Sequence, residues 1–146
     1  MKIKQLSVFL ENKPGRLSVP CKALSKAGIN ILTLSLADTR QFGILRLVLK
    51  NWQQAKQVLE GAGLVVNVTE VVAIEVADRP GGLAGVLETI EQAGINLEYM
   101  YAFTFGSEEK AVLVFRFEDP DAAIKVLQSK GVNVVGSVEL FDRAKH

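Results

Sequence analysis

Two short turns in this chain carry the residues best suited to bind a small molecule. Each turn pairs proline with glycine just before a predicted helix, whose first backbone N–H groups lack intrahelical partners and therefore attract anions. Asn12 precedes the first turn and Asp78 precedes the second, and their side-chain oxygens can accept hydrogen bonds from an ammonium group. Donors for a carboxylate beside acceptors for an ammonium group suit a zwitterionic amino acid.

Both turns belong to an internal repeat, which sets the architecture of the chain. Pro80 lies 66 positions after Pro14, and Asn96 lies 66 positions after Asn30. The matched segments are Lys13-Pro14-Gly15-Arg16-Leu17 with Gly28-Ile29-Asn30, and Arg79-Pro80-Gly81-Gly82-Leu83 with Gly94-Ile95-Asn96. We therefore expect two domains, residues 1–69 and 70–146. Domains this small bury modest cores, so the two are expected to pack on each other.

Hydrophobic periodicity predicts the same order of elements in both halves. The first half has expected strands at 3–10, 29–37, 42–49 and 64–68, and helices at 17–27 and 52–60. The second half has expected strands at 71–76, 95–105, 111–117 and 132–135, and helices at 83–93 and 122–129. Asp119 and Pro120 stand at the expected N-cap and first position of the last helix. Each half therefore reads βαββαβ, a ferredoxin-like α+β sandwich with an antiparallel sheet.

The two halves differ in length at one place. Beyond the hairpin the offset between matched residues grows from 66 to 68, since Val126 matches Val58 and Gly131 matches Gly63. We assign the two extra residues to the second hairpin loop, 106–110, because insertions are best tolerated in surface loops.

The composition narrows the possible functions. A net charge of +1 gives no electrostatic footprint for nucleic acid or an anionic membrane. No apolar run approaches the length of a membrane helix, and the first residues lack a secretion signal, so we expect a cytoplasmic protein. The single cysteine, Cys21, excludes an intramolecular disulfide, and the single histidine, His146, excludes a histidine-based triad or multi-histidine metal site. We expect no catalysis, cofactor or metal.

The repeated segments resemble the ACT domain family, small βαββαβ modules that bind amino acids and regulate metabolic enzymes. The resemblance covers essentially the whole chain as two tandem copies, carried by Glu11 to Leu17 with Gly28-Ile29-Asn30 and by Asp78 to Leu83 with Gly94-Ile95-Asn96. The resemblance implies two domains paired side by side that bind an amino-acid effector, and it implies no catalytic domain. Binding of the effector would then act on a partner enzyme or change the oligomeric state of the protein. A homodimer is also expected.

The resemblance also implies where the effector sits, at the interface between the strand–helix loop of one domain and the start of the second strand of the other. The first such site consists of Asn12, Lys13, Pro14, Gly15, Arg16 and Leu17 with Asn96 and Leu97. The second consists of Asp78, Arg79, Pro80, Gly81, Gly82 and Leu83 with Asn30 and Ile31. Because Asp78 is charged and Gly82 leaves room, we expect the second site to bind more tightly.

Several alternatives stay open beside this one. The fold could serve in assembly without binding a ligand, or could host an enzyme, although no nucleophile–base pair is evident. Arg40-Gln41-Phe42-Gly43 faintly resembles an RNA-binding motif, but aliphatic residues follow where exposed aromatics are needed. The stripe Tyr99, Tyr101, Phe103 and Phe105 is interpreted as core or as an inter-domain or oligomer surface. Cys21 lies on the apolar face of its predicted helix and is expected to be buried and inert.

Overall fold

The computed structural model describes residues 1–38, 40–107 and 109–143, and its contacts divide the chain into two units. We call Lys4–Thr69 the N-terminal unit, and Met1–Ile3 together with Glu70–His146 the C-terminal unit. The division falls after Thr69, and the first three residues group with the C-terminal unit.

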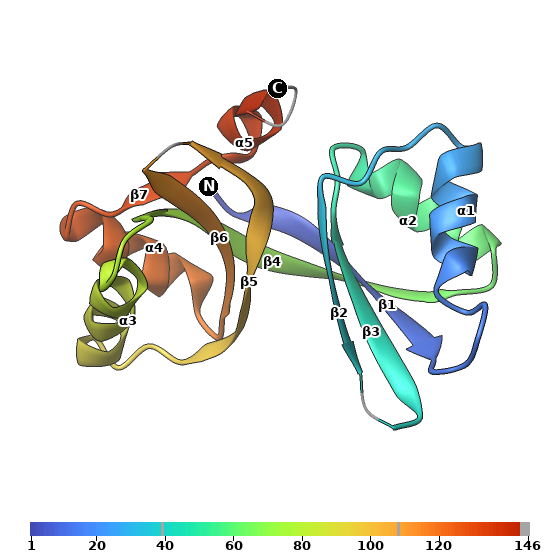
Figure 1. Ribbon diagram of the computed structural model, residues 1–146, viewed down its shortest axis with the longest axis horizontal. Coiled ribbons are helices and arrows are strands. Elements are labelled where there is room, and N and C mark those ends of the chain that lie inside the picture. Colours follow the sequence, from blue (N-terminus) through green and yellow to red (C-terminus); the bar gives the residue numbers. More distant parts are fainter. Residues whose placement is uncertain (39, 108, 144–146) are drawn as a thin grey trace. The chain divides into compact units, whose positions relative to one another are not determined.

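The N-terminal unit is a sheet with two helices on one face (Figure 1). Its elements are β1 (Ile3–Glu11), α1 (Ser18–Lys26), β2 (Thr33–Asp38), β3 (Phe42–Val48), α2 (Trp52–Gly61) and the first part of β4 (Val65–Ala77). Its strand order is β2-β3-β1-β4, so the first strand lies inside the sheet and the second strand lies at an edge. Both β1 and β2 pair with β3 in antiparallel register.

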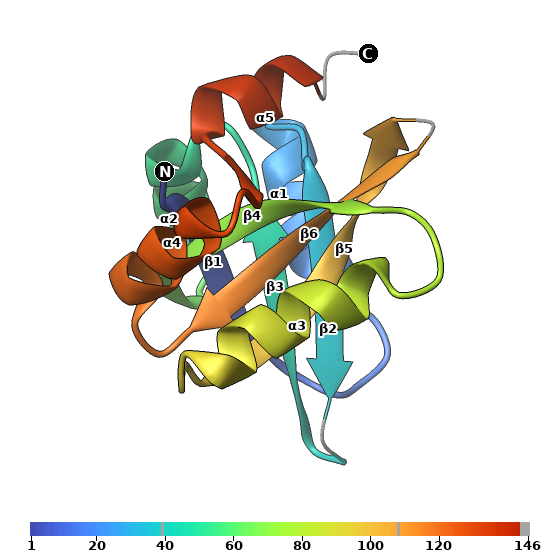
Figure 2. The ribbon, with the colours of Figure 1, turned by 90° about the vertical axis from the view of Figure 1, so that its left-hand side faces the viewer.

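The C-terminal unit repeats this arrangement and adds one helix (Figures 1 and 2). It contains the rest of β4, then α3 (Gly82–Gln92), β5 (Leu97–Ser107), β6 (Lys110–Phe117), α4 (Pro120–Ser129), β7 (Asn133–Val135) and α5 (Ser137–Arg143). Its strand order is β5-β6-β4-β7, the same as in the N-terminal unit. The predicted βαββαβ order and the α+β class are therefore confirmed in both halves.

Alternation along the strands builds a separate core in each unit. In β1, every second side chain faces the helices, because neighbouring residues of a strand point to opposite faces. These side chains meet one apolar stripe from each helix. The N-terminal core includes Leu6, Val8, Leu10, Leu24, Leu45, Leu47, Ala55 and Leu59, and the C-terminal core includes Val72, Ile74, Val76, Val86, Ile90, Phe115, Phe117 and Leu127.

The start of helix α4 has the N-cap and the proline that the sequence predicts. The Asp119 carboxylate accepts a hydrogen bond from the backbone N–H of Ala122 at 3.1 Å, and Pro120 occupies the first turn. Proline costs nothing there, since the N–H it lacks would have no intrahelical partner. The predicted N-cap and first helical position are confirmed.

The prediction of two separate strands around residue 69 is wrong. The chain from Val65 to Ala77 forms one continuous strand, β4, where strands at 64–68 and 71–76 were expected. The expected break rested on the repeat boundary alone. No proline or glycine stands between the two predicted strands, and Thr69 favours extended backbone, so nothing in the local sequence interrupts the strand.

The two-residue insertion of the second half lies in a strand and not in the predicted loop. Between the pairs Ala102↔Leu113 and Gly106↔Ala111, β5 advances by four residues while β6 advances by two. The surplus is taken up as an irregularity of β5, in the manner of a β-bulge, which restores the pairing on either side. The two-residue difference in length between the halves could not by itself distinguish a longer loop from a bulged strand.

Helix α5 was not predicted, because its seven residues are too few for hydrophobic periodicity to indicate a helix. Its Arg143 guanidinium donates to Glu75 Oε2 at 2.7 Å and to Glu139 Oε1 at 2.6 Å. Glu75 Oε1 accepts from Asn133 and from Lys110, each at 3.2 Å. The Glu75 side chain is only 8% exposed, so this carboxylate links α5 to strands β4, β6 and β7.

We expect Glu75→Gln to lower the free energy of unfolding by about 1–2 kcal/mol, since it weakens hydrogen bonds to a charged acceptor. Burial on its own raises the pKa of Glu75, but hydrogen bonds from Arg143, Asn133 and Lys110 outweigh it, and the pKa lies below the ordinary 4.5. A depressed pKa in the folded state stabilises the protein above the unfolded pKa, and this contribution disappears as pH falls through the folded value.

Urea titrations between neutral pH and about pH 3 measure the free energy of unfolding as a function of pH. This range includes the ordinary pKa of glutamate. Wild type should lose stability relative to Glu75→Gln as pH falls below the ordinary value. Glu91→Gln, on the exposed side of α3, is the matched control. An identical pH profile for wild type and Glu75→Gln would show that the Glu75 carboxylate does not stabilise the fold.

Candidate functional site

The two Pro-Gly turns adopt closely related backbone structures. The Asn12 backbone N–H donates to the Gln41 carbonyl at 2.9 Å, and the Asp78 N–H donates to the Glu109 carbonyl at 2.8 Å. Gly15 has φ +84° and Gly81 has φ +87°, a left-handed conformation that glycine adopts without strain. Each turn is therefore fixed to the adjacent hairpin in the same way, and the sequence repeat is a repeat of local structure.

The helices that follow the turns begin without a side-chain cap. Leu17 stands at the N-cap of α1 and Gly81 at that of α3, and neither makes a capping hydrogen bond through a side chain. Helix α2 is likewise uncapped, whereas α4 is capped by Asp119. The backbone N–H groups of Arg16, Val19 and Gly82 donate to carbonyls of their own turns, so donors to a carboxylate, which the helix dipole favours, must come from the other first-turn amides.

Arg16 and Gly82 occupy equivalent positions, and they explain why the two helices begin differently. A Cβ atom built on Gly82 would lie 2.0 Å from the Ala77 carbonyl oxygen, so only glycine permits this close approach. Helix α3 starts at Gly82, whereas α1 starts at Ser18, two positions later in the repeat. A residue with a Cβ, such as Arg16, cannot adopt the turn that Gly82 forms without a shift of the backbone. The lack of a side chain at Gly82 is required by the tight turn, so it does not indicate space for a ligand.

The predicted site residues of the two turns are accessible to a ligand. All of them are exposed except Gly82, which is half-buried: Asn12, Lys13, Pro14, Gly15, Arg16 and Leu17 in one unit, and Asp78, Arg79, Pro80, Gly81 and Leu83 in the other. Asn30 and Asn96 are also exposed, while Ile31 and Leu97 are half-buried. The Asn12 side-chain amide reaches the Arg40 carbonyl at 3.5 Å and stays close to the surface of its own turn.

Within one unit, the turn and the start of the second strand lie at opposite ends of the sheet. Glu11 pairs with Phe42 at one end of β3, and Thr33 pairs with Val48 at the other. Six residues of strand separate these pairs, which corresponds to roughly 20 Å. A single amino acid cannot bridge the Asn12 turn and Asn30 of the same unit. The same pairing pattern holds in the C-terminal unit, where Ala77 pairs with Lys110 and Leu97 with Phe117.

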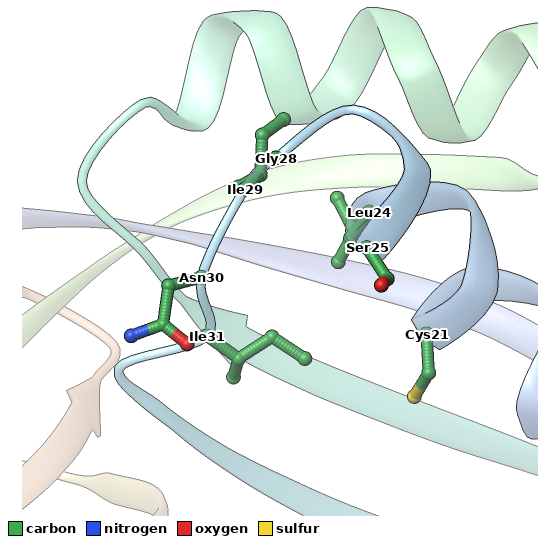
Figure 3. A pocket seen from close by; sticks show the side chains of 7 residues that line it. All are labelled: Cys21, Leu24, Ser25, Gly28, Ile29, Asn30 and Ile31. Carbon is green, nitrogen blue, oxygen red and sulfur yellow. The ribbon is translucent and has the colours of Figure 1, made fainter.

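Asn30 and Ile31 line an open pocket of about 360 Å³ beside α1. The other lining residues are Cys21, Leu24, Ser25, Gly28 and Ile29 (Figure 3). In this view the Asn30 carboxamide turns away from Cys21. The prediction that Cys21 is buried is wrong, because its position on α1 faces this open pocket and is exposed. Its apolar spacing with Leu24 was real, but only Leu24 reaches the core.

A second cavity of about 220 Å³ lies behind the first turn, between β1, the start of α1 and the α2–β4 loop. Its polar side chains are Glu11 and Arg16, and it is completed by Phe9, Leu10, Val19 and residues 62–65. Lys13 Nζ lies 3.1 Å from Glu11 Oε2 and lowers the pKa of Glu11 below its ordinary value, and the charge of Arg16 adds to this effect. Sequence reasoning missed this cavity, because residues 62–65 lie far from the turn along the chain.

Tyr99 and Tyr101 of the β5 aromatic stripe lie on the face of the sheet opposite the C-terminal core. Tyr101 pairs with Val114, whereas the neighbouring Met100 pairs with Phe115, which belongs to the core. Tyr99 and Tyr101 are half-buried and Phe103 is buried, while the Phe105 side chain lies outside the described residues. Tyr99 and Tyr101 therefore lie away from the helices, whereas Phe103 is buried, and the interpretation of the stripe as core or as an inter-domain or oligomer surface stays a prediction.

Metal sites and membrane-spanning helices are considered for residues 1–38, 40–107 and 109–143. In these segments, no group of three or more histidine, cysteine, aspartate or glutamate side chains is placed to hold a metal ion. None of the helices in the same segments has the length and apolar character required to cross a bilayer. His146 lies outside the described residues.

Comparison with known proteins agrees with the repeated fold. A family model of the ACT domain pair matches residues 1–143. No curated protein matches the chain. Protein BT0572 from Bacteroides thetaiotaomicron has a crystal structure that is similar with a TM-score of 0.89 and 38% identity, covering 97% of this chain and 96% of that one.

Regulatory subunits of aspartate kinase share the fold at lower identity. The ligand-free subunit from Thermus thermophilus has a TM-score of 0.62 and 16% identity, covering 86% of this chain and 91% of that one. The subunit from Thermus flavus has a TM-score of 0.60 and 17% identity, covering 86% and 90%. The match over residues 1–143 and the twice-repeated βαββαβ order show that this chain belongs to the ACT domain family, as a pair of these regulatory modules.

Proposed function

We propose that this protein senses an amino acid through its two Pro-Gly turns and transmits the signal by regulation, without catalysis of its own. The observation that carries the proposal is the pair of matched turns. Each combines uncapped helix amides, which favour a carboxylate, with an oxygen of Asn12 or Asp78, which can accept from an ammonium group. Both charged ends of an amino acid find partners at one turn.

We further propose that each turn is half of a site. Asn12 to Leu17 would be completed by Asn96 and Leu97, and Asp78 to Leu83 by Asn30 and Ile31, in the manner that the ACT family implies. The separation of roughly 20 Å between a turn and the second strand of its own unit supports this, because one unit cannot supply both halves. A ligand held by two units stabilises one mutual arrangement, and it regulates only through its differential affinity for that arrangement.

The signal would reach a metabolic enzyme acting in trans or a homodimer of this chain in the cytoplasm. The competing proposal is an assembly module that has kept the ACT fold and lost its ligand. The two are separated by thermal denaturation of the whole chain in the presence of each common amino acid. Binding raises the free energy of unfolding by about 2.7 kcal/mol at a hundredfold excess over Kd. If no amino acid raises the melting temperature, the sensor proposal fails and the assembly module is favoured.

The two turns should contribute unequally to this response. We expect Asp78→Ala to reduce the stabilisation by the active amino acid more than Asn12→Ala does, since a hydrogen bond from an ammonium group to a carboxylate is stronger than one to an amide. Titration calorimetry on both variants measures the loss, expected at roughly tenfold in Kd for Asp78→Ala. Equal losses would contradict the proposal of two unlike sites.

A further inference from the structure

We propose that two copies of this chain dock through charged faces of their helices, the basic face of one copy against the acidic face of the other. The basic face consists of Lys22, Lys26 and Lys50, and the acidic face consists of Glu88, Glu91 and Glu118. This contact goes beyond the proposed function, because it names the surface on which copies meet and does not depend on an amino acid. None of the six residues belongs to the proposed half-sites.

The two units carry opposite net charges, which the charge of +1 for the whole chain conceals. Residues 4–69 contain nine lysine or arginine residues and three aspartate or glutamate residues, a formal charge of +6. The remaining residues contain eight basic and thirteen acidic residues, a formal charge of −5. Because these charges nearly cancel, two copies repel each other little as whole molecules, while their unlike units attract.

The charge is reversed at equivalent positions of the repeat. Glu88 stands 66 positions after Lys22, and Glu118 stands 68 positions after Lys50, the offset that applies beyond the hairpin. Lys22 and Glu88 lie on the helix that follows the Pro-Gly turn, whereas Lys50 and Glu118 each stand two positions before the second helix of their unit. The two units therefore present opposite charges on the same framework.

Lys22 and Glu88 point away from the cores of their units. Each is exposed and stands two positions from both buried residues of its helix. The buried residues are Pro20 and Leu24 in α1, and Val86 and Ile90 in α3. At 3.6 residues per turn, two positions correspond to about 200°, so both charges stand on the outer side of the helical layer, which Figure 2 shows for α3 and α4.

The three lysines gather at one end of the N-terminal unit. Lys26 lies one helical turn after Lys22, in the last turn of α1. The backbone N–H of Leu32, which follows α1, donates to the carbonyl of Val48 at 3.0 Å, so the chain after α1 meets the end of β3. Lys50 comes two residues after that strand end.

The acidic face has the same layout in the C-terminal unit. Glu91 lies in the last turn of α3, three residues after Glu88. The Glu118 N–H donates to the carbonyl of Asn96 at 3.1 Å, which brings the start of α4 to the end of α3. Each face therefore offers three charges of one sign on matching positions.

The charges of both faces are available to a partner. Within the described part of the chain, none of the six side chains forms an ion pair, whereas Glu11 and Glu60 are paired with Lys13 and Lys56. A single exposed ion pair contributes little, so three charges on each face, used twice when a twofold axis relates the copies, are needed. A nucleic acid would match the basic face and be repelled by the acidic unit, which favours a second copy as the occupant.

Sedimentation velocity of the full chain, without amino acids, tests the contact. We expect a dimer at about 100 µM protein in about 0.1 M salt. Its Kd should rise at least about tenfold in about 1 M salt, where the Debye length falls from about 10 Å to about 3 Å. A wild-type chain that stays monomeric in low salt would overturn the proposal.

Charge reversal tests which faces meet. Lys22→Glu with Lys50→Glu makes both faces negative, and Glu88→Lys with Glu118→Lys makes both positive. Each double variant alone should self-associate at least about tenfold more weakly than wild type, since like charges then oppose each other. A one-to-one mixture should form a mixed dimer more tightly than either variant forms with itself, because each supplies the face that the other lacks. Recovery in the mixture also shows that both variants are folded.

Arg40→Glu with Lys130→Glu is the matched control, with the same change of total charge away from both faces. Arg40 precedes β3, which Lys50 follows, and Lys130 follows α4, which Glu118 precedes. This variant should dimerise as wild type does. A mixture of the reversed variants that does not associate would overturn the proposal. A wild-type monomer that binds an oligonucleotide and loses it on Lys22→Glu would assign the basic face to nucleic acid instead. The proposed function stands in either case, because no amino acid is present.

Discussion

Leu140→Ala is expected to lower the free energy of unfolding by about 2–5 kcal/mol, the range for deleting a fully buried leucine side chain. The Leu140 side chain has no exposed area, although α5 lies near the end of the chain and is only seven residues long. A helix this short is unstable alone, because forming its first turn costs more than its few hydrogen bonds return. Burial of Leu140 and the ion pairs of Arg143 must therefore hold α5 in place.

Val138 supplies the matched control on the same helix. It is 76% exposed, so Val138→Ala should change the free energy of unfolding by less than about 0.5 kcal/mol. Urea denaturation followed by circular dichroism measures both variants. Equal small effects at Leu140 and Val138 would show that α5 is not anchored by its leucine.

Gly82→Ala is expected to destabilise the protein by about 1–3 kcal/mol, since the added methyl group forces the surrounding backbone to shift. The new Cβ would stand 2.0 Å from the Ala77 carbonyl oxygen and 3.0 Å from its carbon, and both neighbours are backbone atoms that cannot rotate away. We expect the relaxed variant to open its turn and to start α3 later, as α1 does after Arg16.

Gly85→Ala is the opposing control, one turn further along α3. A Cβ at Gly85 meets no atom within 4 Å, so alanine should stabilise the helix by about 1 kcal/mol through its better helix propensity. The two substitutions make the same chemical change in one helix and should have opposite signs in urea denaturation. Stabilisation by both would contradict the steric role of Gly82.

Much of the fold could be predicted from the sequence, because local signals and the repeat point to the same elements. Pro14 and Pro80, each followed by glycine, predicted the turns, and Asp119 with Pro120 predicted the start of α4. The repeat, with an offset of 66 residues before the hairpin and 68 beyond it, then related the elements of one half to those of the other. Turn residues and helix caps act on residues close by in the sequence, so they can be recognised in a single sequence.

The features that were missed depend on contacts between distant residues. Burial of Leu140 and the bonds of Glu75 with Arg143 hold α5, and 68 positions separate that pair. The exposure of Cys21 follows from which side of α1 meets the sheet. The cavity behind the first turn joins Arg16 to residues 62–65, which no spacing rule connects. The half-sites built on Asn12 and Asp78 stay a prediction, because each requires residues from a second unit.

The central claim, that the turns bind an amino acid, is tested most directly by nuclear magnetic resonance. Backbone amide resonances of the ¹⁵N-labelled chain would be followed while each common amino acid is added to about 10 mM, ten times the Kd of a weak millimolar site. We predict saturable shifts at Gly15 and Arg16 or at Gly81 and Gly82 for at least one amino acid. Unchanged resonances at all four amides, for every amino acid, would contradict the account.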